Sequence, residues 1–126
     1  MIDDKTLLEL AAKAANYGLY ESPNDATGRV MIWRDGRIVE FNSLADDGDA
    51  LRLAARLKLC IDTGCELFNG YDKDCNWIKS PAVCVWKSSG TPVRVDEKYG
   101  DDEAGAIRRA ITRAAVALAD PTKGQA

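Results

Sequence analysis

The spacing of apolar residues along the chain predicts three helices. Residues 4–17 carry leucines and alanines three or four positions apart, follow an acidic cap and end just before Gly18, as an amphipathic helix does. Residues 48–58 repeat this pattern after a run of aspartates. The last predicted helix begins at Asp101-Asp102-Glu103 and stops at Asp120-Pro121, because proline cannot continue a helix.

A β-hairpin is predicted between the first two helices. Residues 29–33 and 37–41 are rich in β-branched and aromatic side chains, and Arg34-Asp35-Gly36 lies between them. An Asp-Gly pair between two apolar runs is the strongest short-range signal of a tight antiparallel turn. The polar stretch before the hairpin, residues 20–25, is predicted to be a loop.

Further strands are predicted in the middle of the chain. Their expected ranges are 60–68, 77–78, 82–86 and 93–95. Gly64 is expected to form a bulge. Pro81 is expected to break the strand or to mark a sheet edge, because proline has no N–H group to donate. Residues 69–76 are predicted to form a polar, turn-rich loop.

These elements predict an α+β domain in which helices are layered on a mainly antiparallel sheet, in the order α-β-β-α-β-β-(β)-α. The chain has 126 residues, the size of one domain that buries its own core. Residues 1–120 are predicted to form this domain, and residues 121–126 a frayed tail. The apolar runs are far shorter than the roughly 20 residues of a membrane span, so no membrane association is expected.

The composition argues against an enzyme. The sequence contains no histidine, which excludes Ser-His-Asp and Cys-His nucleophiles, histidine-ligated zinc and the commonest general base near neutral pH. It also lacks the glycine-rich phosphate loops and the Gly-x-Ser-x-Gly turn of hydrolases. We therefore expect a non-enzymatic protein that carries no cofactor.

Charge and cysteines limit the partners and the compartment. The formal net charge is −3, whereas nucleic-acid binders carry a basic excess, so direct binding of nucleic acid is not expected. The N-terminus does not have the pattern of a secretion signal, which predicts a cytoplasmic protein.

The four cysteines are Cys60, Cys65, Cys75 and Cys84. They lack the paired C-x2-C spacing of zinc ribbons, so we expect reduced thiols that pack mostly as small hydrophobic residues, with no metal.

Three segments resemble a recurring group of short proteins from tailed phages and prophages. They are residues 7–15, 44–54 and 103–115. Together they make the chain similar, over roughly residues 3–119, to the phage "ABA sandwich" domain family. Residues 40–44 stand where the family pattern has Trp-Asn-Pro before its acidic run. The resemblance implies a phage or prophage origin, the cytoplasm of a bacterial host and a sheet layered with helices, and it transfers no catalytic residue.

Acidic residues at two helix starts form the first candidate site. Asp46, Asp47 and Asp49 precede the second helix and offer carboxylates to Mg²⁺ or Ca²⁺. The EF-hand pattern fails, because its twelfth position is Leu57, and the simpler interpretation is helix capping and interaction with the helix dipole. If the start of the last helix lies nearby, both runs would form an acidic patch for a basic partner surface.

Arginines on two helices form the second candidate site. Arg109 and Arg113 are four residues apart and share a face of the last helix. With Arg52 and Arg56 they would form a cluster that binds phosphate or carboxylate groups. The alternative is an ordinary solvated helix face.

Aromatic residues near the predicted loop form the third candidate site. Residues 69–77 combine Tyr71, Lys73 and Trp77 in a polar segment, whose length suits recognition. Trp and Tyr are frequent at the hot spots of protein interfaces. The alternative is that the tryptophans belong to the core and that the loop only connects two strands.

These features favour a small phage-encoded accessory protein that binds a host or phage protein. An anti-defence factor such as an anti-CRISPR inhibitor is one form of such a protein. Three other functions stay open. They are sequestration of a nucleotide-type ligand in a pocket lined by Trp and Arg, an enzyme with a metal site at Asp46, Asp47 and Asp49, and an accessory role in the virion or in packaging. A homodimer is also left open.

Overall fold

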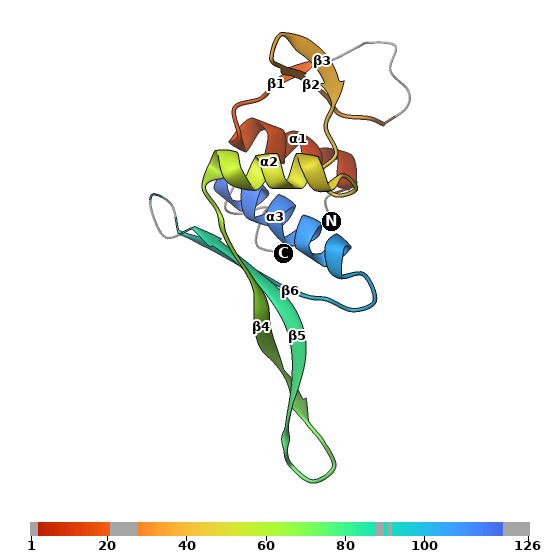
Figure 1. Ribbon diagram of the computed structural model, residues 1–126, viewed down its shortest axis with the longest axis vertical. Helices are drawn as coiled ribbons and strands as arrows, with labels where there is room; N and C mark the ends of the chain where they lie inside the picture. Colours follow the sequence, from red (N-terminus) through yellow and green to blue (C-terminus); the bar gives the residue numbers. More distant parts are fainter. Residues whose placement is uncertain (1–2, 21–27, 88–89, 91, 120–126) are drawn as a thin grey trace.

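The computed structural model describes residues 3–20, 28–87, 90 and 92–119. Within these residues it has three helices and two three-stranded antiparallel sheets (Figure 1), which confirms the predicted α+β class. The helices are α1 (Asp4–Ala14), α2 (Asp47–Leu57) and α3 (Glu103–Ala119). The smaller sheet consists of β1 (Gly18–Tyr20), β2 (Met31–Arg34) and β3 (Arg37–Glu40). The larger sheet consists of β4 (Cys60–Tyr71), β5 (Trp77–Lys87) and β6 (Val93–Lys98).

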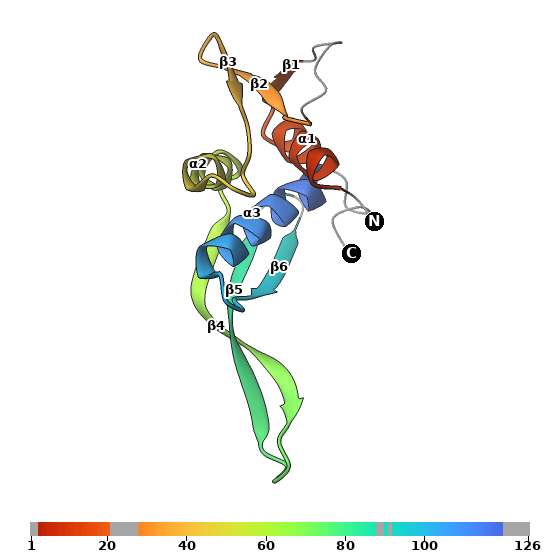
Figure 2. The same ribbon diagram turned by 90° about the vertical axis from the view of Figure 1, so that its right-hand side faces the viewer.

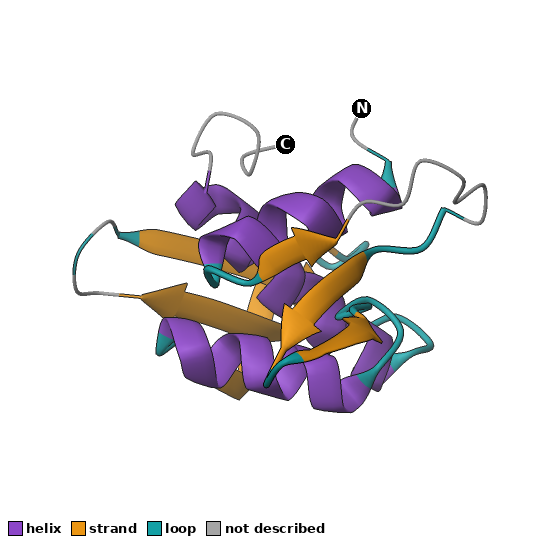
Figure 3. Ribbon diagram, turned by 90° about the horizontal axis from the view of Figure 1, so that it is seen from above, coloured by secondary structure: helices purple, strands orange, loops and turns teal. Residues whose placement is uncertain are grey.

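Helix α3 lies at the centre of the fold. It packs against β5 and β6 on one side and against α1 and α2 on the other, and the smaller sheet lies beyond α1 and α2 (Figure 2). Seen from above, the smaller sheet crosses over the helices (Figure 3). The buried residues of α3 are Gly105, Ala106, Ala110, Ile111, Thr112, Ala114, Ala115, Val116 and Ala117. Most are small, so the layers on both sides come close to the helix axis, and α3 is buried around most of its circumference.

The hydrophobic core draws its largest side chains from β2, β5, α2, α3 and the residue that follows β3. Its largest fully buried apolar side chains are Phe41, Ile32, Leu53, Val83, Val85 and Val116. The ring of Phe41 also packs against Tyr17, with centroids 5.8 Å apart. Ser43 and Thr112 are buried as well, and their hydroxyl oxygens lie 2.7 Å apart. This hydrogen bond meets the need of buried polar groups for a partner.

The β2–β3 hairpin confirms the prediction made from its turn residues. Arg34 pairs with Arg37, so the connecting turn consists of Asp35 and Gly36 alone. Both have positive φ, 53° and 75°, as a type I′ turn requires at its two central positions. The turn thereby fixes the register of the two strands.

Helix α1 is shorter than its apolar pattern predicted. It ends at Ala14 rather than at residue 17, and Asn16 adopts a left-handed conformation with φ 59°. Gly18, predicted to end the helix, instead begins β1 and pairs with Trp33. The predicted order therefore lacked one strand. A strand of three residues gives no periodicity to read, and only its pairing with β2 defines it.

The prediction for the β4–β5 region was wrong for residues 69–71, which belong to β4 rather than to a loop. Pro81 was expected either to break the strand or to mark a sheet edge, and the second alternative is confirmed. β5 runs through Pro81 at the point where its pairing with β6 has ended. The carbonyl of Pro81 accepts a hydrogen bond from the N–H of Tyr99 at 3.2 Å. Because the nitrogen and the carbonyl of a strand residue point to the same side, the nitrogen of Pro81 faces the point where β6 has ended. The missing N–H group therefore points away from β4, and the β4–β5 ladder loses no hydrogen bond at Pro81.

The β4–β5 hairpin continues far beyond the rest of the larger sheet. The last β5 residue that pairs with β6 is Ala82, so residues 66–81 form a two-stranded ribbon, here named the arm. Figure 1 shows the arm projecting away from the three helices. The predicted bulge at Gly64 is confirmed by a register shift between Asp62 and Cys65.

Three sequence predictions fall largely or wholly outside the described residues. They are the loop at 20–25, the stop at Asp120-Pro121 and the tail at 121–126. Among the helices that the structure describes, none is long and apolar enough to cross a membrane.

Candidate functional site

Three aromatic side chains form a cluster near the end of the arm. Phe68 lies with its ring centroid 5.3 Å from that of Tyr71 and 5.2 Å from that of Trp77. Tyr71 and Trp77 are 6.3 Å apart, and all three contacts are edge-to-face, the arrangement that aromatic quadrupoles favour. The three residues are nevertheless 53%, 58% and 66% exposed. The structure thus places Tyr71 and Trp77 together, as a surface rather than as part of the core.

A bulge in β4 brings the aromatic side chains to one face of the arm. Positions 68 and 71 are three apart, so in a regular strand their side chains would point to opposite faces. The register shifts between Phe68 and Tyr71, and Gly70 adopts a φ of 90°. A bulge of this kind restores the side chains to the same face. Trp77 then lies directly opposite Tyr71.

A tight turn at the tip holds the two strands together. The carboxylate of Asp72 accepts hydrogen bonds from the backbone N–H groups of Asn76 at 2.9 Å and Asp74 at 2.8 Å. These N–H groups lower the pKa of Asp72 below its usual value, because they favour the charged form. Lys73 is exposed in this turn, next to the aromatic cluster in sequence.

A shallow hollow of about 470 Å³ lies beside the cluster on the same face of the arm. Its lining residues are Gly64, Glu66, Phe68, Trp77 and Lys79. The Nζ atom of Lys79 lies 4.0 Å from a carboxylate oxygen of Glu66. The hollow therefore combines aromatic walls with one acid and one base that neutralise each other.

The aromatic face of the arm continues the side of the larger sheet that α3 covers. Along β5, Lys79, Pro81 and Val83 share one face, because side chains alternate along a strand. Val83 is fully buried on this face, and Lys79 lies opposite Phe68. Among the described residues, the helix layer ends before the arm does (Figure 2). The apolar side of the sheet thus extends past its own cover.

The arginines predicted to bind an anion already interact with other groups of the protein. Arg109 and Arg113 both bind Glu97 of β6, at 3.2 Å and 2.8 Å. Arg56 donates to the carbonyl of Ala15 at 2.6 Å and lies over the ring of Tyr17. The structure therefore separates the pair on α3 from Arg56.

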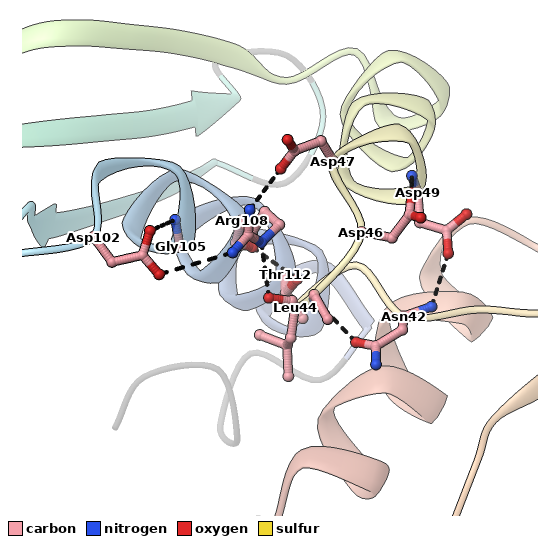
Figure 4. A network of polar contacts seen from close by, with 10 residues as sticks. Asn42, Leu44, Asp46, Asp47, Asp49, Asp102, Gly105, Arg108 and Thr112 are labelled. Atoms are coloured by element: carbon pink, nitrogen blue, oxygen red, sulfur yellow. Dashed lines mark hydrogen bonds and ion pairs between the residues drawn. The ribbon is translucent and has the colours of Figure 1, made fainter.

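The three candidate aspartates before and within α2 take three different structural roles (Figure 4). Asp46 caps the helix by accepting from the N–H of Asp49 at 2.9 Å. Asp47 pairs with Arg108 of α3 at 2.6 Å. Asp49 is buried, accepts from the N–H of Asn42 at 2.9 Å, and takes part in further ion pairs.

The ion pairs of Asp49 include one of the predicted cluster arginines. Asp49 binds Arg52 at 2.7 Å and Arg34 at 3.3 Å. The pairing with Asp49 raises the pKa of Arg52. Asp49 and Arg52 therefore bind each other rather than an external ligand. The three aspartates do not converge on one point. Among the described residues, no group of three or more potential ligands is placed to hold a metal ion.

The two acidic helix starts do lie near each other, but an arginine stands between them. Arg108 contacts Asp47 at 2.6 Å and Asp102 at 3.9 Å, and its Nε donates to the carbonyl of Leu44 at 2.9 Å. Asp102 also caps α3 by accepting from the N–H of Gly105 at 2.9 Å. The predicted acidic patch is therefore partly neutralised from within (Figure 4).

A second hollow, of about 520 Å³, lies on the other face of the larger sheet. Its lining residues are Asp62, Cys65, Cys84, Trp86, Pro92, Val93 and Arg94. It brings a tryptophan and an arginine together, as the nucleotide hypothesis required. Arg94, however, pairs with Asp96 at 3.2 Å, and Asp62 adds another carboxylate. A phosphate group gains little in such surroundings.

The four cysteines are free thiols with different environments. Cys84 is buried, Cys65 is half-buried, and Cys60 and Cys75 are exposed, so only part of the set packs as hydrophobic residues. Burial, together with the neighbouring Asp96, raises the pKa of Cys84 to about 12. Because the thiolate is the reactive form, Cys84 is expected to be inert near neutral pH.

Alkylation under native conditions tests these thiol environments. Treatment with iodoacetamide at pH 8 is expected to modify Cys60 and Cys75 quickly and Cys84 only after the protein unfolds, because Cys84 is both inaccessible and protonated. Peptide mass spectrometry measures each site, and labelling in denaturant is the control. Equal rates for Cys84 and Cys75 in the folded protein would contradict this placement.

Sequence reasoning missed Phe68 as a member of the site. It assigned Phe68 to one strand, Tyr71 to the following loop and Trp77 to the start of the next strand, so it had no reason to add Phe68 to the other two. The pattern that would have found the cluster is a Gly in a strand between two aromatic residues, followed by a short Asp- and Asn-rich turn and a third aromatic residue.

Comparisons of the chain with protein-family models, curated proteins and solved structures find no match.

Proposed function

We propose that this chain is a non-enzymatic protein-binding module that contacts its partner with the aromatic face of the arm. The observation that carries the proposal is the cluster of Phe68, Tyr71 and Trp77, more than half exposed at the end of a projecting ribbon. Exposed aromatic clusters of this kind are unusual on monomers and frequent in interfaces. The resemblance to phage proteins favours a host or phage protein as the partner.

The charges around the cluster favour an apolar and uncharged binding site on the partner. Glu66 and Lys79 pair beside the aromatic rings, so these two side chains together offer no net charge to a charged ligand. The binding of nucleic acid depends on unpaired basic side chains. Arg109 and Arg113, by contrast, are held by Glu97. A protein cleft that accepts aromatic side chains suits the arm better than a phosphate backbone or a lipid headgroup does.

Affinity capture with matched variants tests this function. Trp77→Ala and Phe68→Ala are expected to lose the partner, whereas Leu51→Ala is expected to retain it. Leu51 is a suitable control because it is 66% exposed, like Trp77, but lies on α2. With the captured partner purified, calorimetry is expected to show a loss of about 2 kcal/mol or more for Trp77→Ala, a factor of roughly 30 in affinity.

Salt dependence separates this mode of binding from an electrostatic one. Affinity is expected to change little between about 50 and 200 mM salt, a range in which protein–DNA contacts lose several orders of magnitude. If Trp77→Ala bound as tightly as the unaltered chain, or if affinity collapsed over this salt range, the proposed function would be wrong.

A further inference from the structure

Two residues at the end of β6 contact the arm and its base. Lys98 is the last residue of β6, and its Nζ atom donates to the Oδ1 atom of Asn69 at 2.7 Å. Tyr99 follows and donates its hydroxyl to the carbonyl of Thr63 at 2.6 Å. Figure 2 shows the end of β6 at the base of the arm. Neighbouring side chains of one strand end therefore hold β4 at two points, one in the arm and one just before it.

The two contacts approach from opposite faces of the larger sheet. Lys98 pairs with Ala82, and side chains alternate along a strand. Its side chain therefore lies on the face away from α3, since α3 covers the face of Val83. Tyr99 instead packs against the hydrophobic core, and its N–H group donates to the carbonyl of Pro81 at 3.2 Å. The end of β6 thus contacts both strands of the hairpin.

The base of the arm contains the irregularity at which a ribbon bends most easily. A register shift interrupts the pairing of β4 with β5 between Asp62 and Cys65, and a bulge leaves its extra residue outside the ladder. Here the carboxylate of Asp62 accepts from the N–H of Gly64 at 2.9 Å, and the carbonyl of Thr63 accepts from Tyr99. Side chains therefore bind the backbone of the bulge and restrain it.

We propose that Tyr99 and Lys98 are positioning residues that hold the arm at a fixed angle to the helices. Tyr99 leads through a short turn into α3, so the restraint is anchored to the central helix of the fold. Two strands alone are marginally stable in water, and among the described residues β6 does not pair with β5 beyond Ala82. The two side chains supply part of the support that a third strand gives elsewhere in the sheet.

Tyr99 is expected to contribute more to the restraint than Lys98. The hydroxyl of Tyr99 belongs to a half-buried side chain that packs on the core, whereas Lys98 and Asn69 are both exposed. Water competes for an exposed polar contact, and a lysine side chain loses conformational freedom on forming it. Tyr99→Phe is therefore expected to loosen the arm more than Lys98→Met does.

The effect of this restraint on binding rests on the proposed function. A flexible arm loses freedom when a partner binds, and that loss lowers the affinity. An arm that is already restrained loses less. Neither Lys98 nor Tyr99 lines the hollow beside the aromatic cluster, so both act on the partner through the orientation of the arm.

NMR relaxation tests the restraint without the partner. In the unaltered chain, the amides of residues 66–81 are expected to have order parameters of about 0.85, as in a rigid backbone, and in Tyr99→Phe these are expected to fall towards about 0.6. Tyr20→Phe is the matched control, because it removes a hydroxyl group from a tyrosine of the smaller sheet, and it is expected to leave the arm unchanged. Residual dipolar couplings of the arm and the helices are expected to fit one alignment tensor in the unaltered chain but not in Tyr99→Phe.

Two results would overturn the restraint, namely a loose arm in the unaltered chain or an unchanged arm in Tyr99→Phe. With the captured partner, calorimetry is expected to show binding to Tyr99→Phe that is about three- to tenfold weaker. A loosened arm with unchanged affinity would overturn the positioning role and leave the proposed function intact. If instead Trp77→Ala retained the partner, the proposed function would fail, while the order parameters would still decide whether Tyr99 holds the arm.

Discussion

Replacing Phe41 by alanine is expected to lower the free energy of unfolding by about 3–5 kcal/mol. Among the residues that the structure describes, Phe41 is the largest fully buried side chain, 1% exposed, and its ring packs against Tyr17. Its backbone N–H also donates to the carbonyl of Val30 at 2.8 Å, which ties the end of β3 to the chain entering β2. Truncation leaves a cavity that the surrounding small residues cannot fill, because cores relax only partly.

Urea denaturation measures this effect, and the chain provides its own control. Phe68→Ala removes the same atoms from a side chain that is 53% exposed, so its effect on stability is expected to stay within about 1 kcal/mol. Equal destabilisation by the two variants would show that the arm, and not the helix-packed body, limits the stability of the protein.

The second large effect is expected for Asp49→Ala, at about 3 kcal/mol of lost stability. Asp49 is the one buried carboxylate among the described residues, and it joins three segments through Asn42, Arg34 and Arg52. Its removal leaves the N–H of Asn42 without this acceptor and two guanidinium groups without their partner. Leaving part of a buried network unpaired is more harmful than losing an exposed ion pair.

Asp47→Ala is the matched control for this prediction. Asp47 is one residue into α2 and pairs with Arg108, but its side chain is 78% exposed, so its loss is expected to cost no more than about 1 kcal/mol. Thermal and urea unfolding of both variants measure the difference. Similar losses for Asp47 and Asp49 would show that the aspartates act through the helix dipole alone.

Local patterns were sufficient for the elements whose causes are local. The type I′ turn at Asp35-Gly36 needs two residues with positive φ, and the sequence supplies suitable ones. Helix α2 begins at its aspartates and ends within a residue of the predicted limit. Capping and helical periodicity depend on neighbours a few positions away, which is why they can be read directly.

The candidate site could be predicted only in part. Tyr71 and Trp77 were selected for their residue type, and they do lie together. Phe68 joins them only because a bulge rotates β4 between positions 68 and 71. The predicted arginine cluster illustrates the opposite case. Arg109 and Arg113 share a helix face, but Glu97 of β6 occupies both, and no spacing along the chain reveals that pairing.

The sequence by itself determined the α+β class, the tight hairpin and most helix limits, because short-range periodicity, turn conformation and capping set these features. Only the tertiary structure decided which charges are free and where the sheet ends. Pro81 lies in a continuous strand because β6 stops beside it. The aromatic cluster is exposed because the helix layer is shorter than the β4–β5 hairpin. Both outcomes depend on contacts between residues far apart in the chain, which no local pattern records.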